Sequence, residues 1–273
     1  MDLLNENRDS AKIIAGGQSL VPVLNLRLAS PSLLIDLNRI PEIAGISIAS
    51  DGSLVAGAMT RHRTFERSAE VGQTHPLVQH AAGFIAHAQV RNRGTIGGSL
   101  CHADPAAEWP AICLVCDAEI TLANSAGQRT IAAEDFSLGV YTTALREDEI
   151  LVNVRFPRSR AGRRWGFEEV SRRHGDFAIV GVACLLDIDT RGDCTAARIV
   201  VFGAGDRPTL VHEAAFALIN TQLGPQVLAN AGRIARERVE ARSDHHASSE
   251  YRSELVEVLT RRALGQAFAR SVR

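Results

Sequence analysis

The sequence predicts an α+β protein of two domains, and three observations support this. A chain of 273 residues is long enough for about two domains of ordinary size. A short apolar segment at 13–15 runs into a glycine pair and then into a helical pattern, the order of a strand, a tight turn and a helix. In the last third of the chain a cluster of strands precedes a cluster of helices, which is typical of α+β proteins.

The first part of the chain, about 1–58, is expected to form an α/β subdomain. Apolar residues at 21, 24 and 28 recur with helical spacing. Asp51-Gly52 favours a hairpin turn between the apolar segments on either side of it. The expected elements are strands at 13–15, 33–37, 46–49 and 54–56 and a helix at 21–28.

A second subdomain is expected over about 59–157, so that the first domain spans 1–157. Helices are predicted at 76–88 and from Pro105 to Cys116, because proline suits the first turn of a helix. Residues 89–99 are polar and glycine-rich and are predicted to be neither helix nor strand. Strands are expected at 119–123 and 150–156.

The remaining residues, 158–273, predict a C-terminal domain with a three-stranded antiparallel sheet and helices. Three apolar segments follow one another closely, a spacing that suits an antiparallel meander. Ser248 or Ser249 can cap the last helix. The expected elements are strands at 166–170, 177–186 and 197–202 and helices at 213–220, 226–240 and 251–269.

Composition excludes several classes of function. With 30 basic and 31 acidic residues, the chain lacks the basic footprint of a nucleic-acid-binding protein. Its longest nearly uninterrupted apolar run, 177–186, is far shorter than the ~20 residues of a membrane span. Residues 1–9 lack the apolar core of a secretory signal, and five scattered cysteines do not form a disulfide scaffold. We therefore expect a cytoplasmic protein.

Two glycine-rich segments carry the chemistry. They are Ala15-Gly16-Gly17-Gln18-Ser19, here called the first glycine loop, and Thr95-Ile96-Gly97-Gly98-Ser99, the second glycine loop. A glycine pair lets backbone N–H groups approach an anion closely, because no Cβ intervenes. The first loop also opens onto a predicted helix, whose N-terminus favours phosphate. Both loops could hold one diphosphate, but two plain turns explain the spacing equally well.

Other motifs do not complete a known site. Gly203-Ala-Gly205 follows a strand, but Pro208 stands where a dinucleotide fingerprint needs its third glycine. Cys113 and Cys116 have a C-x-x-C spacing without a second pair, so they are interpreted as core residues. His245-His246 is interpreted as a solvated turn. No metal site is predicted.

The surroundings of the two loops carry a family resemblance. The first reads Lys12-Ile-Ile-Ala-Gly-Gly-Gln-Ser-Leu20, and the second reads Val90-Arg-Asn-Arg-Gly-Thr-Ile-Gly-Gly-Ser-Leu-Cys-His-Ala-Asp-Pro105. They resemble the two FAD motifs of the medium subunit of molybdenum hydroxylases, the family of the carbon monoxide dehydrogenase medium subunit and the xanthine dehydrogenase FAD domain. The likeness continues through 175–183 and 247–252, and so covers almost the whole chain.

The resemblance implies a PCMH-type FAD-binding domain, similar to vanillyl-alcohol oxidase and MurB, with the FAD diphosphate on the two loops. It implies FAD contacts from Ile13, Ile14, Ala15, Gly16, Gly17, Gln18, Ser19 and Leu20, and from Thr95, Ile96, Gly97, Gly98 and Ser99. It adds Glu108, where the family usually has an aspartate, and Leu151, near an apolar contact to the flavin or adenine. The longer acid changes the detail of that contact and keeps the carboxylate.

Two departures from the family pattern bear on these expectations. Family members usually carry a longer segment before the first motif, with an opening strand and most of a helix. We therefore expect either an upstream start codon or a missing strand, which would expose a sheet edge. The cysteine-rich insertion of relatives that hold a 4Fe–4S cluster is absent, so FAD is expected to be the only redox centre in this chain.

The function implied by the resemblance is electron relay, without a catalytic base or nucleophile in this chain. A large molybdopterin subunit hydroxylates the substrate, a small subunit carries 2Fe–2S clusters, and FAD passes the electrons to an external acceptor. The assembly implied is a heterotrimer or its dimer. The alternatives are a self-contained FAD-dependent oxidoreductase of the MurB or vanillyl-alcohol oxidase type and a scaffold that has lost FAD.

Arg91 and Arg93 stand directly before the second loop. One interpretation is that they are solvated loop residues. The other is that one of them holds the loop or helps to neutralise the diphosphate through charge-assisted hydrogen bonds. The second interpretation predicts that replacing Arg91 or Arg93 by alanine weakens FAD binding about tenfold or more.

Overall fold

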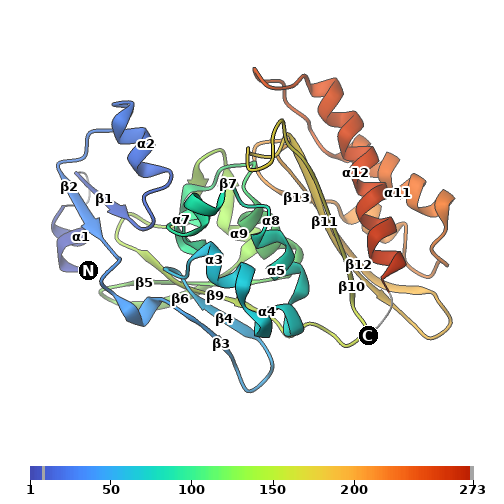
Figure 1. The fold of residues 1–273 in the computed structure, drawn as a ribbon, viewed down its shortest axis with the longest axis horizontal. Coiled ribbons are helices and arrows are strands. Elements are labelled where there is room, and N and C mark those ends of the chain that lie inside the picture. The colour runs from blue at the N-terminus through green and yellow to red at the C-terminus, as the bar shows by residue number, and fades with distance from the viewer. Residues whose placement is uncertain (8–9, 271–273) are drawn as a thin grey trace.

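The computed structural model describes residues 1–7 and 10–270. Figure 1 shows a small N-terminal unit, a central sheet covered by short helices, and a second sheet that carries two long helices on its outer side. The chain is a mixture of helices and sheets, as the sequence predicts.

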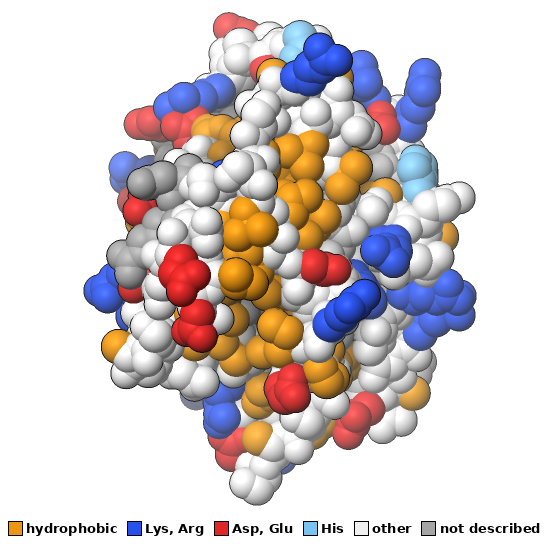
Figure 2. Space-filling model, turned by 90° about the vertical axis from the view of Figure 1, so that its left-hand side faces the viewer, with side chains coloured by type: hydrophobic (Ala, Val, Ile, Leu, Met, Phe, Trp, Pro, Cys, Tyr) orange, Lys and Arg blue, Asp and Glu red, His pale blue; other side chains and the backbone are white. Residues whose placement is uncertain are grey.

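The N-terminal unit contains one parallel pair of strands and little core. Its elements are α1 (Asp2–Glu6), β1 (Ala11–Ile14), α2 (Leu20–Asn25) and β2 (Leu33–Asp36). Ile14 lies opposite Asp36 in the parallel register. Helix α2 has no buried residue, and Leu26 and Leu28 just beyond it are 70% and 73% exposed. Hydrophobic side chains form a band on this side of the molecule (Figure 2).

The central sheet is antiparallel and has the order β3-β4-β9-β5-β6. Its strands are β3 (Ile46–Ile48), β4 (Leu54–Gly57), β5 (Glu119–Asn124), β6 (Gly127–Ala132) and β9 (Ile150–Phe156). The hairpin around Asp51-Gly52 forms as predicted, but it pairs with β9 and not with β1 or β2. This distant pairing places both hairpin strands, which lie before the expected subdomain boundary at 58, in the central sheet.

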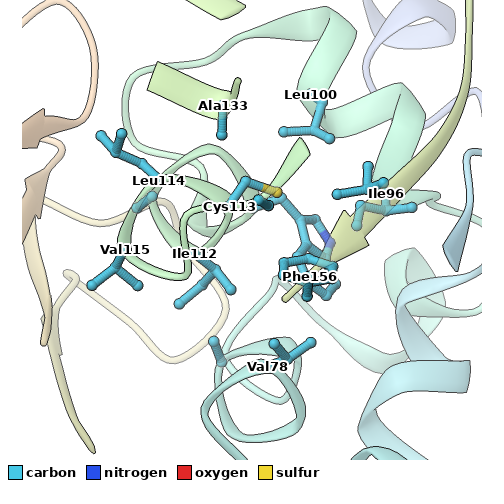
Figure 3. Close-up of a cluster of buried hydrophobic side chains, with 14 of the residues drawn as sticks. Val78, Ile96, Leu100, Ile112, Cys113, Leu114, Val115, Ala133 and Phe156 are labelled. Carbon is cyan, nitrogen blue, oxygen red and sulfur yellow. The ribbon is translucent and has the colours of Figure 1, made fainter. Parts of the chain in front are cut away.

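Short helices cover this sheet. They are η1 (Pro41–Ile43), α3 (His62–Arg67), α4 (Ala69–Thr74), α5 (Pro76–Ala82), α6 (Ala88–Arg91), α7 (Ile96–His102), α8 (Glu108–Val115) and α9 (Ala133–Phe136), and a small hairpin, β7 (Ser137–Gly139) with β8 (Thr142–Thr143), follows α9. The prediction that 89–99 holds no helix is wrong, since α6 ends in it and α7 begins in it. For α7 the reason is tertiary, because Ile96 and Leu100 are fully buried beside Cys113 and Phe156 (Figure 3).

The C-terminal sheet has the order β10-β11-β12-β13 and is antiparallel. Its elements are β10 (Arg164–Val170), β11 (Val180–Ile188), β12 (Cys194–Phe202) and β13 (Thr209–Leu210), followed by α10 (His212–Phe216), α11 (Pro225–Arg238) and α12 (Ser249–Ala269). The predicted meander forms, and the two-residue β13 extends it to four strands. Ser248 caps α12 by accepting from the Tyr251 N–H.

The two sheets are joined through α8. Arg198 of β12 donates to the carbonyl oxygens of Leu114 and Val115, at 2.8 and 3.1 Å. These bonds serve carbonyls at the C-terminal end of α8, where the helix itself offers no i+4 donors and a cation is most favourable. At its other end, the Gly203 N–H donates to Pro105 O at 2.9 Å. No helix within the described ranges is long and apolar enough to cross a membrane.

Candidate functional site

The first glycine loop follows β1 and leaves its backbone donors unused. Gly17 has a φ of +75°, a conformation that favours glycine. Within the described part of the chain, the backbone N–H groups of Gly17, Gln18 and Ser19 donate to no protein atom. The side-chain amide of Gln18 donates to Gly16 O at 3.2 Å. Backbone donors without partners at a glycine turn form a concavity suited to an anion.

The second glycine loop is already held by the protein. Thr95 accepts from the Gly98 N–H at 3.1 Å and so caps α7. The N–H groups of Ile96 and Gly97 donate to Thr60 O and Ala58 O, at 3.1 and 2.8 Å. A Cβ on Gly97 would lie 2.6 Å from the Cβ of Ala58, so only glycine fits there.

The structure brings the two loops together. A Cβ on Gly16 would overlap the carbonyl of Arg93, two residues before the second loop. A Cβ on Gly98 would lie 3.4 Å from the Cβ of Ala15, an ordinary van der Waals contact. The approach at Gly16 depends on glycine, whereas Gly98 simply packs near the first loop. The loops therefore line one site, although about 80 residues separate them in the sequence.

A third cationic residue, which sequence reasoning missed, lies at this junction. The guanidinium of Arg61 donates to Arg93 O and, through Nη2, to Asn38 Oδ1 at 2.5 Å. The Nδ2 of Asn38 in turn donates to Ala15 O at 2.8 Å. Burial, and then the charge of Arg93, lowers the pKa of Arg61. No local motif marks Arg61, because its partners come from two other parts of the chain.

The two arginines chosen from the sequence differ in their environments. Arg91 is 11% exposed and forms a two-point ion pair with Glu66, at 3.0 and 3.2 Å. It also donates to the carbonyls of Ile85 and Ala86. Arg91 thus holds the segment before the second loop and has few donors left for a ligand. Arg93 is exposed, and its side chain has no hydrogen-bond partner among the residues described.

Glu108 is the first residue of α8 and is only 5% exposed. Burial raises its pKa to about 7, and the charge of Asp104 adds to this while Arg91 opposes it. Burial, followed by the charge of Glu108, raises the pKa of Glu169 in β10 to about 8. Glu169 Oε2 is buried without a hydrogen-bond partner in the described part of the protein. The two carboxyls thus favour holding a proton at the junction between the sheets.

The remaining predicted position, Leu151, lies in the main core. It is 3% exposed on β9, opposite Leu122. The same core contains Ile96 and Leu100, so Leu151 supports the helix on which the second loop stands. Any contact with a ligand remains a prediction for this residue.

A buried polar pair lies directly under the second loop. His62 is 4% exposed, and its Nδ1 accepts from the Trp109 indole N–H at 2.9 Å. Burial, and then the charge of Arg61, lowers the pKa of His62 to about 3, so the ring is neutral. A Cβ on Gly94 would lie 2.5 Å from His62 Nε2. The buried imidazole thus packs against the residues that lead into the second loop and supports them.

A cavity of about 590 Å³ opens between the central and C-terminal sheets, at the end of α7 remote from the glycines. Its walls include Tyr141, Phe177 and the buried Arg252. Both aromatic side chains are 60% exposed, and the backbone N–H of Tyr141 donates to Ala103 O at 3.1 Å. The cavity therefore presents aromatic surface in the immediate neighbourhood of α7.

Metal chemistry has no support among the residues that the structure describes. No group of three or more histidine, cysteine, aspartate or glutamate residues is placed to hold a metal ion there. Cys113 is 1% exposed in the core and Cys116 is half-buried, and both are free thiols. His245 and His246 lie in an exposed turn, as predicted.

The site as a whole fits a diphosphate-bearing cofactor. The first glycine loop contributes unused backbone N–H groups, and the second contributes a wall that is fixed to the core. Arg61 lies where the two loops meet. The model "FAD binding domain in molybdopterin dehydrogenase" matches residues 1–159, and "CO dehydrogenase flavoprotein C-terminal domain" matches residues 165–267. The chain belongs to this family.

Relatives place the chain among the medium subunits of the family. It is 41% identical to the 6-hydroxypseudooxynicotine dehydrogenase complex subunit alpha of Paenarthrobacter nicotinovorans, over 98% of this chain and 90% of that protein. It is 40% identical to the nicotine 6-hydroxylase medium subunit of the same organism, over 99% and 94%. A chain of carbon monoxide dehydrogenase from Hydrogenophaga pseudoflava superposes with a TM-score of 0.95 at 35% identity, over 98% and 93%. The family predicted from the two glycine motifs is confirmed.

Proposed function

We propose that this chain is the FAD-carrying, electron-transferring subunit of a molybdenum hydroxylase and binds the FAD diphosphate between its two glycine loops. The observation that carries the proposal is the contact between the loops, one with unused N–H groups and one already fixed to the core. Hydrogen bonds to a charged acceptor are about twice as strong as neutral ones, so an anion is the favoured occupant.

The residues proposed to hold FAD are those of the two loops and their approaches. Residues 13–20 supply the unused donors, and 95–99 supply a rigid opposite wall. Glu108, close to Asp104 in the cavity wall, is proposed as a further contact, and Leu151 as a support from the core. Helix α7 connects the second loop to the cavity over seven residues, or about 10 Å. We propose that the flavin ring lies in this cavity, where Phe177 and Tyr141 offer aromatic surface.

The partners proposed are a large molybdopterin subunit and a small 2Fe–2S subunit, in a heterotrimer or its dimer. Bound FAD supplies the redox chemistry, taking electrons from the small subunit and passing them to an external acceptor. The protein positions the cofactor and contributes no nucleophile. The exposed apolar residues around α2 support the view that this chain works in an assembly.

Two finer points belong to the same proposal. Residues 1–157 form the PCMH-type FAD-binding domain and 158–273 the C-terminal domain, which agrees with β9 ending at Phe156 and β10 beginning at Arg164. The cytoplasm is the proposed location, supported by five cysteines that are all free thiols.

The test is the flavin content of the full chain purified together with its partner subunits. Bound flavin absorbs near ~450 nm, a property of the cofactor itself. We expect about one FAD per chain, released as FAD on denaturation, and reduction of this band by the hydroxylase substrate. A complex that is active but contains no flavin would overturn the proposal. A flavin-loaded single chain with turnover of its own would favour a self-contained oxidoreductase.

A further inference from the structure

The junction between the glycine loops is bridged by one side chain. The two terminal nitrogens of the Arg61 guanidinium bond in different directions, Nη1 to the carbonyl of Arg93 and Nη2 to the side chain of Asn38. Arg93 leads into the second glycine loop. Asn38 follows β2 and donates to Ala15 O of the first loop at 2.8 Å. A continuous chain of hydrogen bonds therefore runs from one loop to the other.

Asn38 is itself fixed in place by hydrogen bonds to Asp36. Its backbone N–H and its Nδ2 both donate to Asp36 Oδ1, at 2.9 and 2.5 Å. The backbone N–H of Asn38 lowers the pKa of Asp36, so this acceptor stays ionised at neutral pH. With Oδ1 bound to Arg61 and Nδ2 shared between Asp36 and Ala15, the amide has one orientation that satisfies all its partners.

The backbone of Arg61 is fixed as well. Arg61 forms an isolated antiparallel bridge with Thr95, flanked by bonds from the His62 N–H to Gly94 O and from the Ile96 N–H to Thr60 O. The next residue, His62, is buried and bonded to Trp109. Arg61 thus stands on the rigid second loop and reaches toward the less supported first loop.

We propose that Arg61 is a positioning residue that clamps the first glycine loop onto the second through Asn38, so that the unused N–H groups of the first loop are aligned before FAD arrives. This inference rests on the proposed FAD role and deepens it. Aligning a loop in advance removes an ordering cost that binding would otherwise include. A planar guanidinium can donate to two separate acceptors at once, which a lysine ammonium on a flexible stem does poorly.

The structure supplies a matched control in Arg63. It lies two residues away and donates to Asn92 Oδ1 at 2.6 Å, so it contacts the approach to the second loop. Among the described residues its side chain makes no hydrogen bond or ion pair with the first loop. Arg63→Ala removes the same charge from the same surface and leaves the bridge through Asn38 in place.

The experiment is titration of the flavin-depleted full chain with FAD, followed by flavin fluorescence at several salt concentrations. We expect Arg61→Ala and Asn38→Ala each to raise the Kd about tenfold, and the double variant to do little more, because both break the same bridge. Arg63→Ala should change the Kd less than threefold, and its effect should multiply with that of Asn38→Ala. Arg61→Lys, which keeps the charge, should resemble Arg61→Ala.

Other outcomes would overturn the clamp. Wild-type affinity in Arg61→Lys would mean that charge alone matters, and independent effects of Arg61→Ala and Asn38→Ala would mean that no bridge connects them. Should Arg61→Ala fold poorly by circular dichroism, Asn38→Ala tests the same bridge from its other end. A wild-type chain that binds no FAD at all would instead refute the proposed function, so the two failures can be told apart.

Discussion

The two glycine loops have the same kind of sequence and opposite structural roles. The second loop begins α7, whose Ile96 and Leu100 are fully buried, and the N–H groups of Ile96 and Gly97 are bonded to the backbone of residues 58–60. The first loop begins α2, which buries no residue, and its N–H groups have no protein partner among those described. Two loops of similar composition therefore differ in role. The second supports the fold, and the first offers backbone donors to a ligand.

This difference explains which glycines serve the fold and which serve the ligand. In the second loop, glycine allows α7 to approach Ala58 and to cross the core closely. In the first loop, Gly17 provides a left-handed turn that directs donors outward. Substitutions in the two loops should consequently separate stability from FAD binding.

The largest effect is expected from Gly97→Val. The added Cβ would lie 2.6 Å from Ala58 Cβ and 2.8 Å from Ala58 O, in a fully packed region. Overpacking of this kind costs about 1–3 kcal/mol or more, so the chain should unfold at a lower temperature even without FAD. Gly265→Val in α12 is the control, since a Cβ there meets nothing within 4 Å. Equal melting temperatures for the two variants would show that the second loop is no structural support.

A smaller effect on stability and a large one on the ligand are expected from Gly17→Val. Left-handed backbone costs a branched residue about 1–2 kcal/mol, and the shifted loop should weaken FAD binding about 100-fold, the equivalent of about 2.8 kcal/mol. Gly192→Val carries a similar strain, with φ of +91° in an open turn. Thermal unfolding and FAD titration of both variants should show similar losses of stability and a loss of FAD only at Gly17.

A pH-dependent test, away from the loops, concerns the buried acids at the sheet junction. Because the pKa of Glu169 is raised from 4.5 to about 8, the folded chain keeps a proton that the unfolded chain releases. Stability should therefore fall as pH rises between these values, by at most about 1.4 kcal/mol per pH unit for each proton. The stability of Glu169→Gln should fall less steeply with pH, because the variant has no proton to release at this position. The difference in free energy of unfolding between the variant and wild type should therefore grow with pH in favour of the variant.

The control for the acid pair is Glu254→Gln, an exposed glutamate on α12. Thermal unfolding from pH 5 to pH 8.5 should give curves for this variant that run parallel to wild type. A Glu169→Gln curve that is also parallel to wild type would mean that Glu169 is ionised in the folded chain and that the pair holds no shared proton.

Local chemistry explains how much of this molecule the sequence predicts. Asp51-Gly52 marks a hairpin, Ser248 caps the last helix, and the glycine pairs mark both loops, because each depends on neighbouring residues only. The polar pattern of 89–99 predicts no helix, whereas α7 begins there because Ile96 is buried in the folded core. Pattern alone cannot supply that information.

The parts of the site that sequence reasoning missed are also the non-local ones. Arg61 is one of many arginines until the fold places Asn38 and Arg93 beside it. Glu169 is unremarkable in β10 until Glu108 approaches from α8. The pairing of β4 with β9 joins segments about 100 residues apart and moves the first hairpin into the central sheet. In each case the property belongs to a contact and not to a sequence motif.

The most direct test of the contrast between the loops is amide hydrogen exchange of the full chain with and without FAD. We expect the N–H groups of Gly17, Gln18 and Ser19 to exchange rapidly in the flavin-free chain and to become protected when FAD binds. Those of Ile96, Gly97 and Gly98 should be protected in both states, because the protein already bonds them. Bound flavin, verified by its absorbance, with no new protection in the first loop would show that the diphosphate lies elsewhere and that the first loop is not its binding site.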